Sequence, residues 1–359
     1  MLVNKDRLIA TFRALVEIQS PTGQEANLIS YVVPRLESAG ARVSVDSGGN
    51  VIAKIDGAGE PILVCSHLDT VMPTAGLKIV ERDGVFYSDG TTILGADDKS
   101  GIAVILEAVA SLREQHMPHL PVEVVLTVAE EVGLVGAKTL DYSQIAAKRG
   151  LCLDTKGPIG TIIVEGPSQV CLDVTIVGKA AHAGMSPEKG ISSIVVAAEA
   201  ISSMPLGRID EETTANVGMI QGGTATNIIP EKTTVAGEAR SRDEQKLEAQ
   251  VDCMVRAFQV AGDRHGATVH VNVEHVYRAF HLGPNDEIVR MMSEAARKLG
   301  LPARMEAGGG GSDTNIFNER GIQSVNVSVG YEDPHSTSEH IAVDDLVRAA
   351  ELLVAVLKG

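Results

Sequence analysis

The segment VVLTVAEEVGLVGAK, residues 124–138, places two adjacent glutamates, Glu130 and Glu131, at the end of an apolar run. Its valine-rich first half predicts a buried strand. Like charges that are neighbours at the edge of a core repel each other and resist dehydration. For an isolated pair of glutamates, simple solvation at a strand end is the usual explanation. The meaning of this pair therefore depends on what surrounds it.

Other apolar strands of the chain also end in acidic or imidazole side chains. The segment LVCSHLDTV carries His67 and Asp69, which share one face of an extended chain because they are two residues apart. LCLDTKG ends at Asp154, and LGADDKSG places Asp97 and Asp98 before a helix. Taken singly, a histidine after a strand is most often an ordinary core or surface residue. Paired aspartates before a helix most often cap it.

The order of predicted elements indicates an α/β domain. Helices are predicted at 5–19, 24–39, 99–115, 134–148, 285–299 and 343–357, and strands at 42–46, 50–55, 61–67, 122–129, 150–154 and 324–330. Apolar runs of this length, separated by helices, predict a sheet that is buried on both faces.

A different pattern interrupts this alternation. Strands are predicted at 170–178, 215–223, 233–241 and 268–277, with helices at 188–204 and 243–262. This βαββαβ order is typical of a ferredoxin-like module. We therefore predict a discontinuous catalytic domain at 1–168 and 280–359, with a mixed sheet flanked by helices, and an α+β domain inserted at 169–279.

Composition argues against two classes of partner. Acidic residues outnumber basic ones by 47 to 31, which gives a net charge of −16, so nucleic acid and anionic membranes are repelled on average. Aromatic residues make up 3%, too few to form the stacking platforms of single-strand binders. The first predicted helix is amphipathic, unlike a signal peptide, and no apolar run approaches a membrane span.

The four cysteines, Cys65, Cys152, Cys171 and Cys253, are far apart and lie mostly in apolar stretches. They lack the spacing of a metal knuckle and are interpreted as core thiols in a reducing compartment. We therefore expect a cytoplasmic protein.

The repeated acidic and imidazole strand ends favour a metal centre. In sheets flanked by helices, the carboxyl ends of the strands line the crevice where ligands bind. Several anions gathered at one buried edge need cations among them. Zinc accepts histidine nitrogen and carboxylate oxygen, and paired metal ions about 3.5–4 Å apart catalyse hydrolysis.

The ordered set HLD, GADDKSG, AEEVG, LCLD and HSTSE resembles the M20 dinuclear zinc peptidases over nearly the whole chain, and among them the tripeptidase or peptidase T-like branch. The resemblance implies that one zinc ion is held by His67 and Asp154. The other would be held by Glu131 and His335, and Asp97 would bridge both ions. Cobalt and manganese are alternatives to zinc.

The resemblance also gives the two glutamates different roles. Glu130 would be the general base, facing a hydroxide that bridges the ions, while Glu131 binds zinc. Asp69 would hydrogen-bond His67 and fix its tautomer. Three ligand carboxylates and one hydroxide would balance the charge of two zinc ions.

Two histidines near the C-terminal end compete for the last ligand position. His335 is preferred over His340 because the family's last ligand typically has a glutamate four residues later, and Glu339 stands in that relation to His335. His340 is interpreted as a surface residue. Asp154, where other members have glutamate, matches the aminopeptidase members better.

The inserted segment resembles the family's lid and dimerisation domain through GKAAHAGMSPEKG, GGTATNIIPEKT and AGEARS. His182 resembles the residue that reaches the other subunit's site and polarises the scissile carbonyl. Asn227 and Arg240 resemble substrate-binding positions, and arginine suits a carboxylate. The alternatives are a loop histidine, a turn asparagine and a surface arginine.

The run AGGGGSDTNIF resembles the family's glycine loop, in which backbone N–H groups of Gly310 and Gly311 would approach the substrate. A phosphate loop is excluded because no Gly-Lys-Ser/Thr follows. A dinucleotide site is excluded because the strand–GxGxxG–helix context is missing.

The resulting hypothesis is a homodimeric metallopeptidase that hydrolyses short peptides, most simply an aminopeptidase acting on tripeptides. On the same scaffold, a carboxypeptidase, a dipeptidase or an N-acyl amino-acid amidohydrolase is the nearer alternative. A metal-binding or assembly protein without turnover is the remote one.

Overall fold

The computed structural model describes residues 2–358, and the chain divides into two compact units. Unit 1 runs from the start of the chain to Glu165 and also includes His281–Gly308 and the chain from Ser312 onward. Unit 2 consists of Gly166–Phe280 together with Gly309–Gly311.

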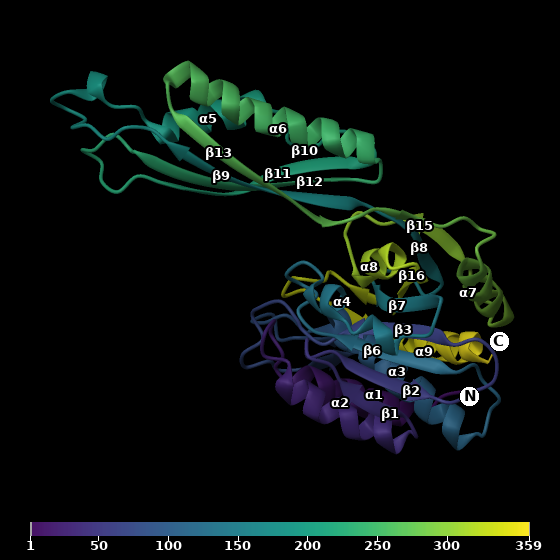
Figure 1. Ribbon diagram of the computed structural model, residues 1–359. Coiled ribbons are helices and arrows are strands. Elements are labelled where there is room, and N and C mark those ends of the chain that lie inside the picture. Colours follow the sequence, from purple (N-terminus) through teal and green to yellow (C-terminus); the bar gives the residue numbers. More distant parts are fainter. Residues whose placement is uncertain (1, 359) are drawn as a thin grey trace. The chain divides into compact units, whose positions relative to one another are not determined.

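A mixed sheet, nine-stranded over the described residues, forms the centre of unit 1 (Figure 1). Its order is β1-β2-β6-β3-β7-β16-β8-β14, with β15 beside β8. The central strands β6, β3, β7 and β16 run parallel, and the outer pairs β1–β2, β2–β6 and β16–β8 run antiparallel. The bounds are β1 Arg42–Val45, β2 Val51–Ile55, β3 Ile62–His67, β6 Val122–Thr127, β7 Arg149–Thr155, β8 Thr161–Gly166, β14 Phe280–His281, β15 Arg304–Ala307 and β16 Gln323–Ser328.

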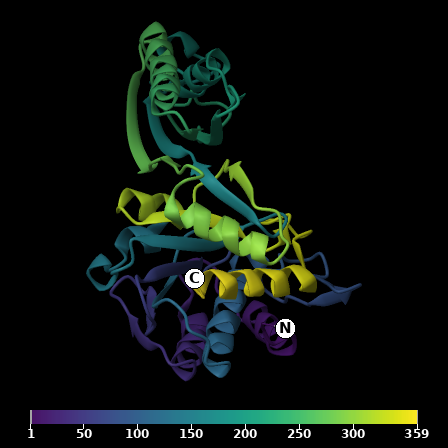
Figure 2. The ribbon, with the colours of Figure 1, turned by 90° about the vertical axis from the view of Figure 1, so that its right-hand side faces the viewer.

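Helices cover both faces of this sheet, as the fully buried central strands require. Successive side chains of β3 point to opposite faces: Ser66 donates to Asp98 at the start of α3, whereas Cys65 packs in a cluster with Phe317 of α8. Helices α7 and α9 lie side by side (Figure 2). The bounds are α1 Lys5–Glu17, α2 Ala26–Ser38, α3 Ala96–Glu114, α4 Val135–Thr139, α7 Glu287–Lys298, α8 Asp313–Glu319 and α9 Val343–Leu357. The predicted α/β class, with a mixed sheet flanked by helices, is confirmed.

A small antiparallel sheet in the order β17-β18-β5-β4 brings two distant segments together. Its strands are β4 Val80–Arg82, β5 Val85–Tyr87, β17 Tyr331–Glu332 and β18 His340–Ala342. Because β18 pairs with β5, the loop that carries His335 is tied to the segment that leads into α3.

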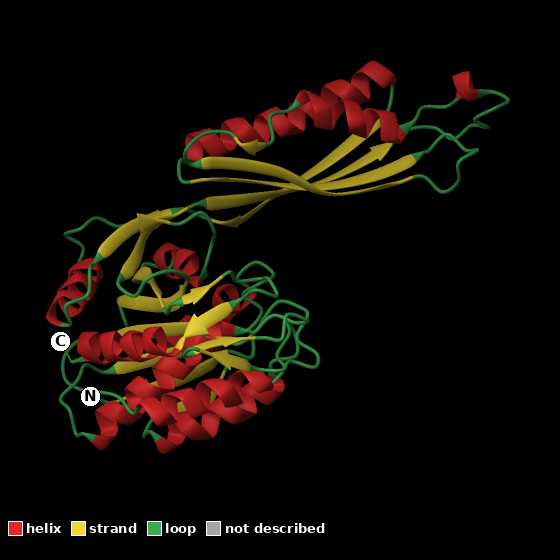
Figure 3. Ribbon diagram, turned by 180° about the vertical axis from the view of Figure 1, so that it is seen from behind, coloured by secondary structure: helices red, strands yellow, loops and turns green. Residues whose placement is uncertain are grey.

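Unit 2 is an antiparallel sheet in the order β10-β11-β12-β9-β13, with α5 and α6 over one face (Figure 3). Val174, Val235 and Phe258 belong to the core between the sheet and these helices. Apart from the short β10, the strand order is that of a ferredoxin-like fold. The bounds are β9 Ser168–Val177, α5 Ser193–Ser203, β10 Gly207–Arg208, β11 Thr213–Gly222, β12 Lys232–Ser241, α6 Glu244–His265 and β13 Thr268–Tyr277.

The helix predicted at 134–148 is wrong beyond Thr139. The α-helix α4 ends there, and a 3-10 turn at Tyr142–Gln144 follows, capped by the side chain of Asp141. The backbone N–H groups of Ala146 and Ala147 donate to the carboxylate of Glu123, each at 2.9 Å, in place of helical carbonyls. Side-chain acceptors have therefore displaced the helix. Similarly, the helix predicted at 188–204 begins only at Ser193, after a separate 3-10 turn at Pro187–Lys189.

Among residues 2–358, every helix is too short or too polar to cross a membrane.

Candidate metal centre

His67, the last residue of β3, has one ring nitrogen committed to the backbone. Its Nδ1 lies 2.9 Å from the carbonyl oxygen of Asp69, which can only accept, so Nδ1 carries the proton. When the ring is neutral, Nε2 therefore keeps its lone pair. It lies 3.1 Å from Asp97 Oδ1 and 3.7 Å from Asp154 Oδ1. The ring is thus held in the tautomer that a metal ligand needs.

Asp97 stands between two histidines and uses a different oxygen for each. While Oδ1 faces His67, Oδ2 lies 3.4 Å from Nε2 of His335. That same Nε2 lies 3.1 Å from Oε1 of Glu131. The five predicted ligands therefore form one continuous chain of contacts in unit 1: Asp154, His67, Asp97, His335 and Glu131.

These residues fit divalent cations. Ligand atoms around a tetrahedral ion are about 3.3–3.6 Å apart when the ion–ligand bonds are about 2.0–2.2 Å, and the observed separations bracket that range. Oε1 of Glu131 is buried and, apart from its 3.1 Å ion-pair contact with Nε2 of His335, has no polar partner among residues 2–358. Two sets could each hold one ion among the described residues, His67–Asp97–Glu131 and His67–Asp98–Asp154.

Asp98 enters one of these sets although the sequence assigned it no role. It is fully buried, accepts a hydrogen bond from Ser66 Oγ at 2.5 Å and another from the N–H of Gly101 at 3.2 Å. Burial raises the pKa of its carboxyl group well above the usual range, and the negative charge of Asp154 raises it further. Hydrogen bonds to both oxygens make Asp98 a supporting residue beside Asp154 and His67.

Burial and close contacts shift the pKa values of the carboxylates and imidazoles in this cluster. Burial, followed by neighbouring carboxylates, raises the pKa of Asp154 to about 7 despite its contact with His67. Asp97 and Glu131 raise the pKa of His335 to about 10. Burial opposes ionisation of Asp97, but His335 and His67 hold its pKa well below the usual range. The carboxylates thus favour positive charge close to them, which imidazolium groups or bound cations can supply.

Asp69 supports the loop that carries Glu130 and Glu131. Its carboxylate accepts the N–H of Glu130 at 2.9 Å, the N–H of Glu131 at 3.3 Å and the hydroxyl of Thr22 at 2.7 Å. The predicted bond from its carboxylate to His67 is longer, at 3.5 Å, because the ring donates to the backbone carbonyl of Asp69 instead.

Glu130 is buried beside the cluster and is not in the chain of ligand contacts. Burial raises the pKa of its carboxyl group well above the usual range. The preceding residue, Ala129, has a left-handed backbone with φ 49°, which is unfavourable for a residue with a Cβ. Such strained backbone commonly lies at functional sites.

Two further residues contact the ligands and were not predicted. The hydroxyl of Tyr331 donates to Asp154 Oδ1 at 3.2 Å, and Glu339 binds the backbone at Asp97. The sequence offered no signal for Tyr331, since its strand is only two residues long. Glu339 is the reason for preferring His335 over His340 as a ligand, but the sequence assigned no role to Glu339 itself.

The predicted substrate residues of unit 2 lie in two groups. His182 and Asn227 are exposed and adjacent, since the N–H of Ala183 donates to the carbonyl of Asn227 at 3.0 Å. Nδ1 of His182 lies 3.1 Å from the N–H of Gly184 and 3.2 Å from that of Met185, and accepts both. A neutral His182 therefore carries its proton on Nε2 and presents a donor outward.

Arg240 and the glycine loop form the second group. Arg240 makes a two-point contact with Glu238, at 3.1 and 3.0 Å. Tyr277 lies in register with Gln169, which is opposite Arg240, and a Cβ on Gly311 would lie 2.1 Å from the Tyr277 ring. Gly311 must therefore be glycine, whereas a Cβ on Gly310 would meet nothing within 4 Å.

The two groups lie at opposite ends of the unit 2 sheet. Gln169, opposite Arg240, is near the start of β9, and the His182 segment continues beyond Val177 at its end. Pairing extends outward there, with the N–H of Gly178 bonded to Glu231 and the N–H of Ile229 bonded to Ala181. A ten-residue strand spans roughly 30 Å, so one copy of unit 2 cannot place both groups on one small substrate.

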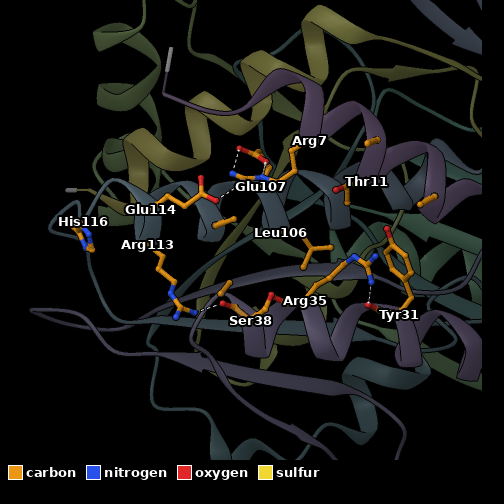
Figure 4. Close-up of a pocket in the computed structure, with 14 residues that line it drawn as sticks. Arg7, Thr11, Tyr31, Arg35, Ser38, Leu106, Glu107, Arg113, Glu114 and His116 are labelled. Atoms are coloured by element: carbon orange, nitrogen blue, oxygen red, sulfur yellow. Dashed lines mark hydrogen bonds and ion pairs between the residues drawn. The ribbon is translucent and has the colours of Figure 1, made fainter.

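A cavity of about 710 Å³ lies elsewhere in unit 1, between α1, α2 and α3 (Figure 4). Arg7 crosses it to the buried carboxylate of Glu107, with Arg35 stacked on the Tyr31 ring on the α2 side. None of the predicted site residues lines it.

The fold and the donor set together define a metal-binding α/β hydrolase. The model of Peptidase family M20/M25/M40 matches residues 63–359. The chain is 43% identical over 367 residues to a Bacillus subtilis (strain 168) protein named "Uncharacterized protein YqjE", covering 99% of each.

Solved structures agree with this match. A crystal structure of aminopeptidase PepT from Bacillus cereus is 42% identical, with a TM-score of 0.90 and coverage of 100% of this chain and 99% of that one. A tripeptidase from Staphylococcus aureus is 38% identical, with a TM-score of 0.95 and the same coverage. The chain belongs to peptidase family M20/M25/M40 and is a peptide hydrolase.

The metal fit gives a first prediction. Loading the apo protein with divalent ions should raise its unfolding free energy, by about 2.7 kcal/mol when the free ion is at about 100 times its Kd. Asp97→Asn should abolish most of this gain because Asp97 faces both halves of the cluster. Calorimetric titration and thermal unfolding measure the two effects. The exposed Asp344→Asn is the matched control, and equal metal binding by both variants would contradict the assignment.

Proposed function

We propose that the protein is an aminopeptidase that removes the N-terminal residue of tripeptides, using two divalent metal ions, most simply zinc. The chain of contacts from Asp154 through His67, Asp97 and His335 to Glu131 carries this proposal, because it offers two adjacent cation subsites. The aminopeptidase and tripeptidase named among the similar structures support the substrate class.

The ligand assignment divides the cluster at Asp97. His67 and Asp154 would hold one ion, Glu131 and His335 the other, and the two oxygens of Asp97 would each face one ion. When bound, such ions polarise the scissile carbonyl and lower the pKa of water toward about 7. Tyr331 would orient Asp154 through its hydrogen bond, and Asp98 lies beside both Asp154 and His67.

Glu130 is the proposed general base. It takes a proton from the attacking water and returns it to the amine that leaves, so the same carboxylate serves both halves of the reaction. Two features support this role: the backbone bond to Asp69 at 2.9 Å and the left-handed turn at Ala129. Asp69 would position two parts of the site: its carboxylate holds the loop that carries Glu130, and its carbonyl oxygen accepts the hydrogen bond from His67.

His182 and Asn227 are proposed to act on the site of a second copy of the chain. The Nε2–H of a neutral His182 is a donor for the oxyanion that develops on the scissile carbonyl. Arg240 would bind the peptide's carboxylate and the N–H groups of Gly310 and Gly311 would line the same end. Since these two groups of residues lie at opposite ends of the sheet, a complete site needs two subunits.

The surface of unit 2 favours a second copy of the chain as its partner. Only Thr214 and Ala215 of β11 pair with β10, which leaves the rest of that strand as an open edge over the described residues. Met219 and Ile220 on this edge are 73% and 53% exposed. Such an edge pairs readily with another strand, and a twofold dimer would cover both copies at once.

Four unpaired cysteines support a reducing compartment, the cytoplasm.

A peptide panel tests the substrate class. Tripeptides with a free amino terminus should be cleaved after the first residue, whereas N-acetylated tripeptides and dipeptides should be poor substrates. Mass spectrometry of the products identifies the bond that is cut. Preferred cleavage of N-acyl amino acids, or removal of the C-terminal residue, would replace this function with an amidohydrolase or a carboxypeptidase.

Glu130→Gln tests the general base. The variant keeps the size of the side chain and should still bind both ions, but kcat should fall by roughly 10²–10⁴-fold because amide nitrogen and oxygen cannot take the proton. Steady-state kinetics and metal analysis are measured on the same preparation. A variant that keeps its kcat would exclude Glu130 as the base.

Subunit complementation tests the shared site. Glu130→Gln and His182→Ala homodimers should both be nearly inactive. A purified heterodimer of the two has one site with both native groups and should recover about half of wild-type activity. Subunits with different affinity tags allow the heterodimer to be isolated. An inactive heterodimer would show that His182 serves its own subunit.

A further inference from the structure

Glu339 joins two segments that each carry a proposed metal ligand. Its side chain is buried, and Oε1 accepts the N–H of Asp97 at 2.8 Å while Oε2 accepts the N–H of Gly95 at 2.7 Å. Both carboxylate oxygens are thus used on backbone groups at the entry to α3. The two segments are more than 240 residues apart in the sequence.

The backbone that Glu339 holds determines where Asp97 points. An aspartate has only two side-chain torsions, so its carboxylate follows the position of its own N–H and Cα closely. Asp97 and Asp98 depart from helical backbone angles, so the usual helical bonds do not fix this turn. The bond from the Asp97 N–H to Glu339 therefore supplies a constraint that the helix does not.

Glu339 also anchors the loop that carries His335. His335 has a left-handed backbone with φ 61°, and Asp333 two residues earlier has φ 53°. Such conformations persist only where the surroundings over-determine them. Within this loop, the N–H of Glu339 donates to the carbonyl of Ser336 at 3.2 Å. Pairing of β18 with β5 ties the ends of these segments together, and the side chain of Glu339 adds the contact that reaches Asp97 itself.

We propose that Glu339 is a positioning residue of the metal centre, which sets the separation between Asp97 and His335 without touching an ion. This inference rests on the proposed function, because it assumes that those two residues share a cation. Removing a partner that orients metal ligands typically costs 10–100-fold in metal affinity. We expect a loss of that size for the ion held between Asp97, Glu131 and His335.

Glu339→Gln removes one of the two acceptors and places an NH₂ group against a backbone N–H. Apo wild type and variant are titrated with Zn²⁺ in competition with a chromophoric chelator, and apo thermal unfolding is measured in parallel. One of the two equivalents should bind 10–100-fold more weakly in the variant. Glu332→Gln, which removes the same charge from the same segment away from Asp97, should bind both equivalents within twofold of wild type.

The outcomes separate three possibilities. Lowered apo stability with unchanged Zn²⁺ affinity would make Glu339 a structural residue and overturn the inference, as would no change in either quantity. Should Glu339→Gln fail to fold, Glu339→Asp carries the test, since it keeps the charge but is too short to reach both N–H groups. If wild type binds two equivalents yet cleaves no peptide, the proposed function fails while the role of Glu339 is still decided by the affinities.

Discussion

The structure depends on one electrostatic constraint, which is that Asp97, Glu131 and Asp154 lie almost out of water and within contact distance of two imidazoles. Buried carboxylates at such spacing are tolerable only with positive charge among them. In the protein alone, the carboxylates raise the pKa values of His335 and His67, and burial raises the pKa of Asp154. Bound divalent ions would favour the deprotonated carboxylate and the neutral rings. Metal binding is therefore coupled to the release of protons from the cluster.

The fold brings these charges together at little cost to its core. Parallel strands β3 and β7 each end at the same edge of the sheet, and their side chains alternate between the α3 face and the α8 face. Cys65 lies two residues before His67 on the same face of β3 and is a fully buried core thiol. The polar residues begin only where the strand ends. The left-handed residues Ala129, Asp333 and His335 lie in short turns outside the regular elements, whereas Asp97 and Asp98 depart from helical angles at the start of α3. A rigid apolar scaffold therefore carries an unfavourable set of charges at its rim.

How far the sequence leads can be judged residue by residue. Apolar runs predicted β3, β6 and β7, because burial and period are local properties. They also showed that His67, Glu131 and Asp154 stand at or just beyond strand ends, whereas the ligand role of each residue was implied by the family resemblance. The sequence alone did not reveal Asp98 or Glu339 as supports, since their roles depend on distant partners: the hydroxyl of Ser66 donates to Asp98, and Glu339 accepts the backbone N–H of Asp97. It also failed at 140–148, where Glu123 captured two N–H groups that a helix would have used. Local patterns identify charged residues at strand ends, but long-range hydrogen bonds decide which elements survive and what holds the ligands.

The geometry of unit 2 limits how many substrate residues one subunit can supply, which no sequence motif shows. His182 and Arg240 are both substrate candidates by resemblance, yet the registers of β9 and β12 put them at opposite ends of strands roughly 30 Å long. A tripeptide is at most about 11 Å long when extended. One copy of unit 2 therefore cannot serve one peptide from both ends, and either one of the two residues has no part in binding or two copies share each site. The open, apolar edge of β11 on the same unit favours sharing, because it supplies the means of bringing a second copy into place.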